Sequence, residues 1–88
     1  MARDQRKVSV ITEFLRESFV GCYVFYHEDE HRVAETYRIV NATTGKTLHL
    51  VSVSGAFLDD HAEAEIVRVL QSLDVLVTLR RAGDTVCL

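Results

Sequence analysis

Residues 27–31, with the sequence HEDEH, form the segment whose residue types and spacing could do chemistry. They match the pattern H-E-x-x-H, in which one face of a helix presents two imidazoles to zinc and the glutamate polarises the attacking water. The preceding residues 23–26 are aromatic or β-branched and favour a strand. The acids within the segment are typical of a solvated turn. The sequence therefore favours a turn at this position over the zinc site of a peptidase.

A broader metal site would draw on all four histidines of the chain. His27 and His31 would flank the turn, while His49 would lie on a later strand. His61 would stand at the start of a helix, and Glu28 could supply a carboxylate. Three histidines and a carboxylate suit zinc, in a metal-binding protein or a small metal-dependent hydrolase. Because nothing in the spacing requires these residues to converge, this alternative ranks second, and we assign no metal ligand and no cofactor.

Nucleophilic catalysis has little support in the sequence. Cys22 alternates with Val20 and Val24, which predicts a place in the core rather than a reactive thiol. The second cysteine, Cys87, is far away in the chain, and two such residues do not make a disulfide framework. There is no phosphate-binding loop and no dinucleotide-binding fingerprint. We therefore assign no catalytic residue and favour a non-enzymatic protein.

The composition is that of one folded domain. The chain has 88 residues, of which 48% are hydrophobic and 26% are charged, so we expect a single α+β domain over residues 1–88. Its apolar runs are shorter than the ~20 residues that a bilayer requires. No signal peptide is evident, because charged residues interrupt the apolar segment that follows the basic start. These observations predict a cytoplasmic protein with no membrane partner.

The charge balance argues against nucleic acid as the main partner. Acidic residues outnumber basic ones by 13 to 10, whereas phosphate binding requires a concentrated basic surface. Basic residues gather near the start, at Arg3, Arg6 and Lys7, and near the end, at Arg80 and Arg81. If the fold brings these two groups together, they form a small basic patch. Weak nucleic-acid binding is therefore the third functional alternative.

The hydrophobic pattern predicts two helices and the strands between them. Apolar residues recur at helical spacing over about 5–19 and again over about 60–73. Asp59 and Asp60 are good N-cap residues for the second of these helices. Three segments between the helices are rich in β-branched and aromatic residues and favour strands. These segments are about 20–27, 32–40 and 46–54.

The connections between the predicted strands are short, which indicates an antiparallel meander. The acidic segment 28–31 is the first turn, and 41–46 is a polar hairpin loop that contains a glycine. The strands do not alternate cleanly between apolar and polar residues. Tyr37 and Ile39 share one face with Glu35, while Val40 lies on the other. Either a β-bulge switches the faces, or both faces of the sheet are partly covered by a partner or by a second copy.

The C-terminal segment fits two structures. Residues 74–83 favour either a short helix capped by Asp74 or a hairpin, and both leave a final strand at 85–88. The predicted fold class is therefore α+β, with an antiparallel sheet of three to five strands packed on two or three helices. The predicted order is α-β-β-β-α, followed by a C-terminal strand that a hairpin or a short helix precedes.

Aromatic residues on the first two predicted strands are the candidates for a contact surface. Tyr23 and Phe25 share one face of their strand, and Tyr26 lies on the other, while Tyr37 lies on the next strand. Core packing is the simpler interpretation of this group, and an aromatic binding surface is the alternative. Apolar residues on both faces of the strands favour a small regulatory or protein-interaction module that contacts a protein partner or a second copy of itself.

Overall fold

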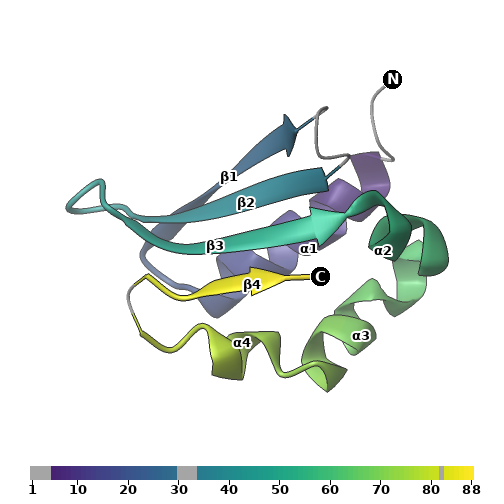
Figure 1. The fold of residues 1–88 in the computed structure, drawn as a ribbon. Coiled ribbons are helices and arrows are strands. Elements are labelled where there is room, and N and C mark those ends of the chain that lie inside the picture. Colours follow the sequence, from purple (N-terminus) through teal and green to yellow (C-terminus); the bar gives the residue numbers. More distant parts are fainter. Residues whose placement is uncertain (1–4, 30–33, 82) are drawn as a thin grey trace.

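The computed structural model of the chain describes residues 5–29, 34–81 and 83–88. The chain forms a mixed sheet covered by a layer of helices (Figure 1). Its strands are β1 (Cys22–Asp29), β2 (Ala34–Asn41), β3 (Thr47–Ser54) and β4 (Thr85–Cys87). Its helical segments are α1 (Gln5–Ser18), α2 (Gly55–Asp60), the 3-10 helix η1 (Glu63–Glu65), α3 (Ile66–Ser72) and α4 (Val75–Thr78).

The four strands stand in the order β1-β2-β3-β4, with β1 and β4 at the edges. The first three strands pair antiparallel, as the short connections between them predict. The prediction of a wholly antiparallel sheet is wrong, because β4 pairs parallel to β3. The helical segments between β3 and β4 carry the chain back to the starting end of β3, and a parallel neighbour requires such a crossover.

The second helix predicted over 60–73 is in fact divided. The hydroxyl of Ser54 accepts a hydrogen bond from the backbone N–H of Phe57 at 3.1 Å, so α2 begins at Gly55. Asp59 and Asp60 consequently lie at the end of α2 and do not cap a helix, contrary to the prediction. His61 is extended, with φ −125° and ψ 131°, and it breaks the helical path before η1 and α3.

The segment after α3 adopts the helical one of the two predicted structures. Asp74 has a positive φ of 52° at the N-cap of α4, and this turn separates α4 from α3. After α4, the carboxylate of Asp84 accepts hydrogen bonds from the backbone N–H groups of Arg80 and Arg81, at 3.1 and 2.8 Å. These bonds fold the chain back toward β4, which extends over Thr85–Cys87 as the predicted final strand requires.

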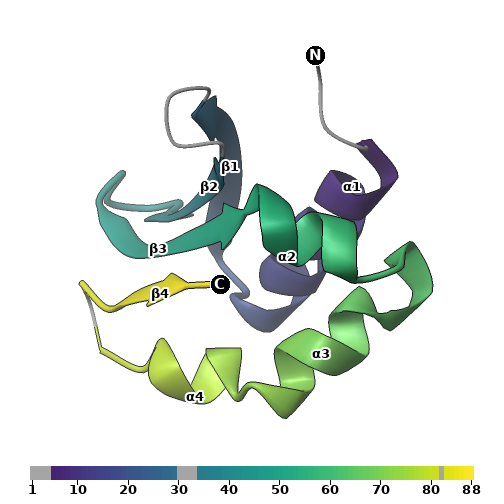
Figure 2. The ribbon, with the colours of Figure 1, turned by 45° about the vertical axis from the view of Figure 1, so that its right-hand side comes forward.

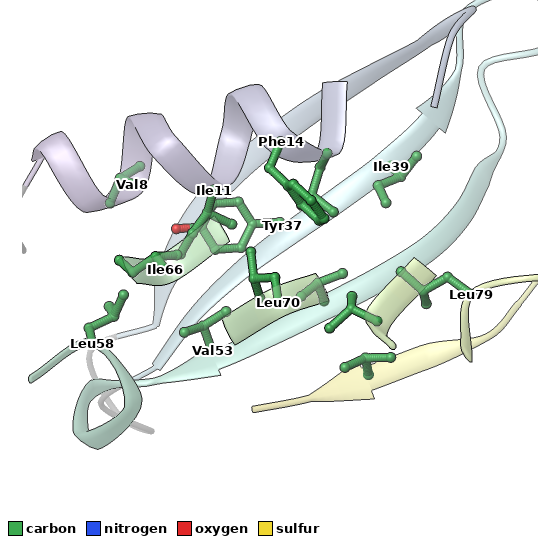
Figure 3. Close-up of a cluster of buried hydrophobic side chains, with 14 residues drawn as sticks. Val8, Ile11, Phe14, Tyr37, Ile39, Val53, Leu58, Ile66, Leu70 and Leu79 are labelled. Carbon is green, nitrogen blue, oxygen red and sulfur yellow. The ribbon is translucent and has the colours of Figure 1, made fainter. Parts of the chain in front are cut away.

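The core lies between the helices and one face of the sheet (Figure 3). Every second residue of β2 and β3 points into it, as period-two alternation requires. The pairing of β2 with β3 shifts its register between Ile39 and Val40, an irregularity that supports the β-bulge among the two alternatives that the sequence leaves open. The buried cluster consists of Val8, Ile11, Phe14, Leu15, Tyr37, Ile39, Val51, Val53, Leu58, Ile66, Leu70, Val75, Leu79 and Val86.

The turned view in Figure 2 shows that the helices lie on one side of the sheet. Helix α1 packs on β1 and against α3. Along the described part of the chain, no helix is both long and apolar enough to cross a membrane.

Candidate interaction surface

The described part of the HEDEH segment lies in a strand. His27 and Glu28 are consecutive residues of β1, so their side chains point to opposite faces of the sheet. The pattern H-E-x-x-H needs a helix to place its ligands on one side, and β1 does not provide that arrangement. Residues 30–33, which include His31, are outside the described part of the chain.

The other two histidines are on different elements and are held by the core. His49 lies on β3, only 6% exposed, with its ring centroid 5.3 Å from that of Phe19. His49 is therefore buried on the core side of the sheet. Its Nδ1 is buried without a hydrogen-bond partner among the described residues. His61 stacks on Phe57 and its Nδ1 lies 2.7 Å from the Phe57 carbonyl oxygen.

The histidines and carboxylates that the structure describes do not gather into a metal site. No group of three or more His, Cys, Asp or Glu side chains within the described ranges could hold a metal ion. His27, His49 and His61 stand respectively on an outward face of β1, on the core side of β3 and at the end of α2.

The basic residues lie at separate ends of the helix layer. Arg6 and Lys7 are in the first turn of α1, whereas Arg80 and Arg81 follow α4 at the far end of the molecule (Figure 1). The Nζ of Lys7 donates a hydrogen bond to the carbonyl oxygen of Leu58. Arg3 lies outside the described residues. Arg6 and Lys7 therefore lie apart from Arg80 and Arg81, and these four residues do not form the single patch that phosphate binding favours.

One face of β1 and β2 is built around a buried carboxyl group. The side chain of Glu35 is fully buried, and its two oxygens accept hydrogen bonds from the hydroxyls of Tyr26 and Tyr37, each at 3.2 Å. The two tyrosine rings lie 5.5 Å apart. Burial, followed by the nearby Glu35, raises the pKa of Tyr37 far above its ordinary value. Tyr37 is 0% exposed, so this candidate contact residue belongs to the core.

The opposite face of the same strands has no helix over it among the described elements. We call it the open face and define it by side chains that alternate with the core residues of each strand. Its residues are Tyr23, Phe25, His27, Thr36, Arg38, Val40, Leu50 and Ser52. The separation of Tyr23 and Phe25 from Tyr26 follows the alternation expected from the sequence.

The open face is rich in aromatic and aliphatic surface. Tyr23 is 60% exposed and Phe25 is 49% exposed, with ring centroids 6.2 Å apart in an edge-to-face arrangement. Leu50, 36% exposed, adds an aliphatic side chain. Val40 is buried, yet it stands outside the core cluster, so the open face has a small apolar interior of its own. A depression of about 450 Å³ lies over β1, β2 and β3 on this face.

Arg38 supplies a positive charge at the centre of the open face. Register places it opposite Phe25 on β1 and Leu50 on β3. Its guanidinium carbon stands 5.7 Å from the centroid of the Phe25 ring, a cation–π contact. The sequence pattern does not point to Arg38 or Leu50, because alternation does not show which face of the sheet the helices leave uncovered.

Two further hollows lie on the surface. One, of about 530 Å³, follows the seam between α1 and α3, where Val10 and Val67 form apolar walls and Glu13 and Glu63 line it as well. The other, of about 580 Å³, follows the free edge of β1 beside Arg16. The second hollow touches residues of both faces of β1, so it runs along the unpaired side of the strand.

Comparison with family models, curated proteins and solved structures finds no match to this chain. The open face and the free edge of β1 are the candidate contact surfaces of the described chain.

Proposed function

We propose that this protein is a non-enzymatic interaction module that binds a polypeptide on the open face of its sheet. The observation that carries the proposal is the exposure of Tyr23, Phe25 and Leu50 on a face that the described helices leave bare. Contiguous exposed apolar side chains on a small domain mark contact sites, because leaving them in water costs free energy that a partner recovers by covering them.

The composition of the open face supports a protein partner more than a nucleic acid. Tyrosine, phenylalanine and arginine are enriched at the centres of protein interfaces. A protein surface that binds a nucleic acid backbone needs several cations. The strands of the described open face supply Arg38 and no lysine. The chain as a whole has a formal charge of −3, which repels phosphate at long range.

Arg38 indicates the kind of polypeptide that fits. No described residue forms an ion pair with Arg38, whose guanidinium rests over Phe25. A partner segment that brings a carboxylate to this guanidinium gains a charge-assisted hydrogen bond. Apolar side chains on the same segment would cover Phe25 and Leu50. We therefore propose that the partner presents an acidic residue between apolar ones.

The experiment is selection from a library of random peptides displayed on phage, followed by amide NMR mapping of the enriched peptides on labelled protein. We expect enriched peptides to combine acidic and apolar residues and to shift the amides of β1, β2 and β3 around Phe25 and Arg38. The variant Phe25→Ser should lose this binding. The matched control is Val77→Ser on α4, because Val77 is 50% exposed and lies outside the sheet.

Three results would overturn the proposal. The peptides could bind Phe25→Ser and the original protein equally, or their shifts could map to the helix layer. A single-stranded oligonucleotide could also shift the same amides at lower concentration than any peptide, which would assign the open face to nucleic acid. Each outcome is read directly from the same set of amide spectra.

A further inference from the structure

The edge strand β1 is the longest exposed edge of the sheet. It pairs with β2 over eight residues, Cys22–Asp29, whereas the other edge strand, β4, has three. No described strand lies beyond β1. A long edge with unpaired backbone groups is a template for pairing with another strand.

The hydrogen-bond phase of the sheet shows which backbone groups of β1 point outward. Ala42 donates its N–H to the carbonyl oxygen of Gly21 at 3.1 Å, in line with the register of β1 and β2. Because bonding residues alternate along an antiparallel ladder, odd-numbered residues of β1 face β2 and even-numbered ones face the free edge. Cys22 fits this phase, since its N–H turns away from β2 to the carbonyl oxygen of Phe19 at 3.2 Å. The backbone groups of Val24, Tyr26 and Glu28 therefore face outward.

The hollow beside this edge is asymmetric in charge. It is lined by Cys22, Tyr23, Val24 and Phe25, and on the helix side by Arg16 of α1. Arg16 is exposed and pairs with no carboxylate among the described residues. At the other end of the strand, Glu28 projects to the same helix side, because it alternates with the residues of the open face. One end of β1 thus lies beside a cation and the other end carries a carboxylate.

We infer that β1 pairs antiparallel with β1 of a second copy of this chain, about a two-fold axis that is perpendicular to the sheet and passes midway between the two Phe25 residues. This axis places Val24 opposite Tyr26 of the second copy, so outward backbone groups meet outward backbone groups. It also keeps the helices of both copies on the same side of one continuous sheet.

Charge complementarity is what selects a second copy as the occupant of this edge. The two-fold axis places Glu28 of the second copy opposite Cys22, beside Arg16, and the symmetry repeats that pairing at the other end. Stacking two open faces against each other would instead bring one Arg38 toward the other. The antiparallel arrangement also keeps the two Glu28 residues at opposite ends of the paired strands. The edge is therefore self-complementary, whereas the open face is not.

This dimer goes beyond the proposed function and does not depend on it. Pairing at the edge leaves the open face of each copy uncovered and joins the two faces at Phe25. The joined surface presents Tyr23 and Phe25 from both copies near the axis. A polypeptide bound to one open face could then continue onto the second, so the dimer provides a longer surface for the partner.

The first test is sedimentation equilibrium of the full chain from micromolar to millimolar concentration. We expect a reversible dimer with twice the monomer mass of 10.0 kDa. The variant Val24→Pro should abolish it, because the N–H of Val24 faces the free edge and its loss leaves the β1–β2 ladder intact. Amide spectra of the variant report whether the fold is kept.

Charge reversal supplies the second test and does not depend on the proline variant. Arg16→Glu or Glu28→Arg alone should weaken the dimer about tenfold, since each change affects two symmetry-related pairs. The double variant R16E/E28R should restore the original dissociation constant. Arg68→Glu is the control, because Arg68 is exposed on α3, away from the edge.

A chain that stays monomeric at millimolar concentration would overturn the dimer. So would a dimer that tolerates Val24→Pro, or charge reversals whose effects simply add. None of these results bears on the open face, because the peptide experiment is carried out at concentrations where the chain is monomeric. The two proposals therefore fail separately.

Discussion

Two pairs of aromatic residues on β1 and β2 lie on opposite faces of the sheet. One pair joins the two strands, and the other lies on β1 alone. Tyr26 and Tyr37 face the helices and share a buried carboxyl group on Glu35. Tyr23 and Phe25 face away from the helices, 60% and 49% exposed, and have Arg38 beside them. The side chains are similar in type, but neighbouring residues of a strand point to opposite faces, so Phe25 is exposed while Tyr26 packs against the core.

The two faces differ in whether a polar atom needs a hydrogen-bond partner within the protein. In the core, each tyrosine hydroxyl donates to Glu35, because an unbonded hydroxyl there costs about 1–3 kcal/mol. On the open face, Tyr23 is 60% exposed, so burial imposes no such requirement on its hydroxyl. The buried Tyr37 and the half-buried Tyr26 therefore contribute to stability, while Tyr23 and Phe25 leave their surface available for binding.

The largest effect should come from removing the buried ring. We expect Tyr37→Ala to lower the free energy of unfolding by about 3–5 kcal/mol, through the cavity it leaves. Tyr23→Ala should lower it by about 1 kcal/mol or less, since most of that ring stays in water. Urea unfolding followed by circular dichroism measures both.

If Tyr37→Ala does not fold, Tyr37→Phe still tests the pair, with an expected loss of about 1.5–3 kcal/mol for a hydrogen bond to a carboxyl group. Equal losses of unfolding free energy at Tyr37 and Tyr23 would contradict the difference in burial between the two rings.

The second effect is a pH dependence of stability that should come from the buried Tyr37. Burial raises the pKa of Tyr37 in the folded chain, while the unfolded chain loses that proton near pH 10.0. The stabilisation is complete below pH 10.0 and is lost as the pH rises further, because only the unfolded state then releases the proton. The slope is at most about 1.4 kcal/mol for each pH unit.

Urea titrations between pH 9 and pH 11 measure this slope, with pH values chosen around the ordinary tyrosine pKa of about 10. Tyr37→Phe should flatten the slope, and Tyr23→Phe should leave it unchanged. Absorbance at the tyrosinate band gives an independent reading, since the native chain should ionise fewer tyrosines than the unfolded chain. An unchanged slope in Tyr37→Phe would contradict the burial argument.

The sequence predicted the part of the fold that local patterns determine. The first helix and the three antiparallel strands are near their expected positions, because long periodic segments and short polar turns define them. Alternation also separated Tyr23 and Phe25 from Tyr26. The α2 start at Gly55 was missed, since the Ser54 hydroxyl caps it and the aspartates that follow are equally good caps.

The remaining features depend on tertiary packing, which one sequence does not display. The parallel placement of β4 is set by the path of the helices after β3, and its three residues carry almost no pattern. The open face is equally a product of packing. Arg38 and Leu50 become candidates only when the position of the helix layer is known, because alternation tells which residues share a face and not which face is bare.

The third effect should have the opposite sign, and it compares two buried polar groups on the core side of the sheet. The Nδ1 of His49 is buried with no partner among the described residues, whereas the carboxyl of Glu35 accepts two hydrogen bonds. We expect His49→Leu to raise the free energy of unfolding by about 1 kcal/mol, because it removes an unsatisfied polar atom and keeps a similar volume. Glu35→Leu should lower it.

Thermal and urea unfolding at neutral pH measure the two variants, and His49→Gln is the control that keeps a polar group in the same position. We expect His49→Gln to be no more stable than the original chain. A loss of stability in His49→Leu, with the fold retained, would mean that the imidazole has a bonding role in the core and that the two buried groups are alike.

The smallest effect on stability should come from Arg38, and it separates stability from binding on the open face. The guanidinium lies 5.7 Å from the Phe25 ring centroid at the surface, so Arg38→Gln should cost about 0.5–1 kcal/mol of unfolding free energy. Binding of the acidic peptides selected on the open face should fall by about ten- to a hundredfold, since a charge-assisted hydrogen bond is worth roughly 1.5–3 kcal/mol. Arg38→Lys keeps the charge but not the planar fork, and we expect it to recover only part of the binding. A variant that loses stability and binding in the same proportion would mean that Arg38 serves the packing of the sheet, and the open face would then resemble the covered one.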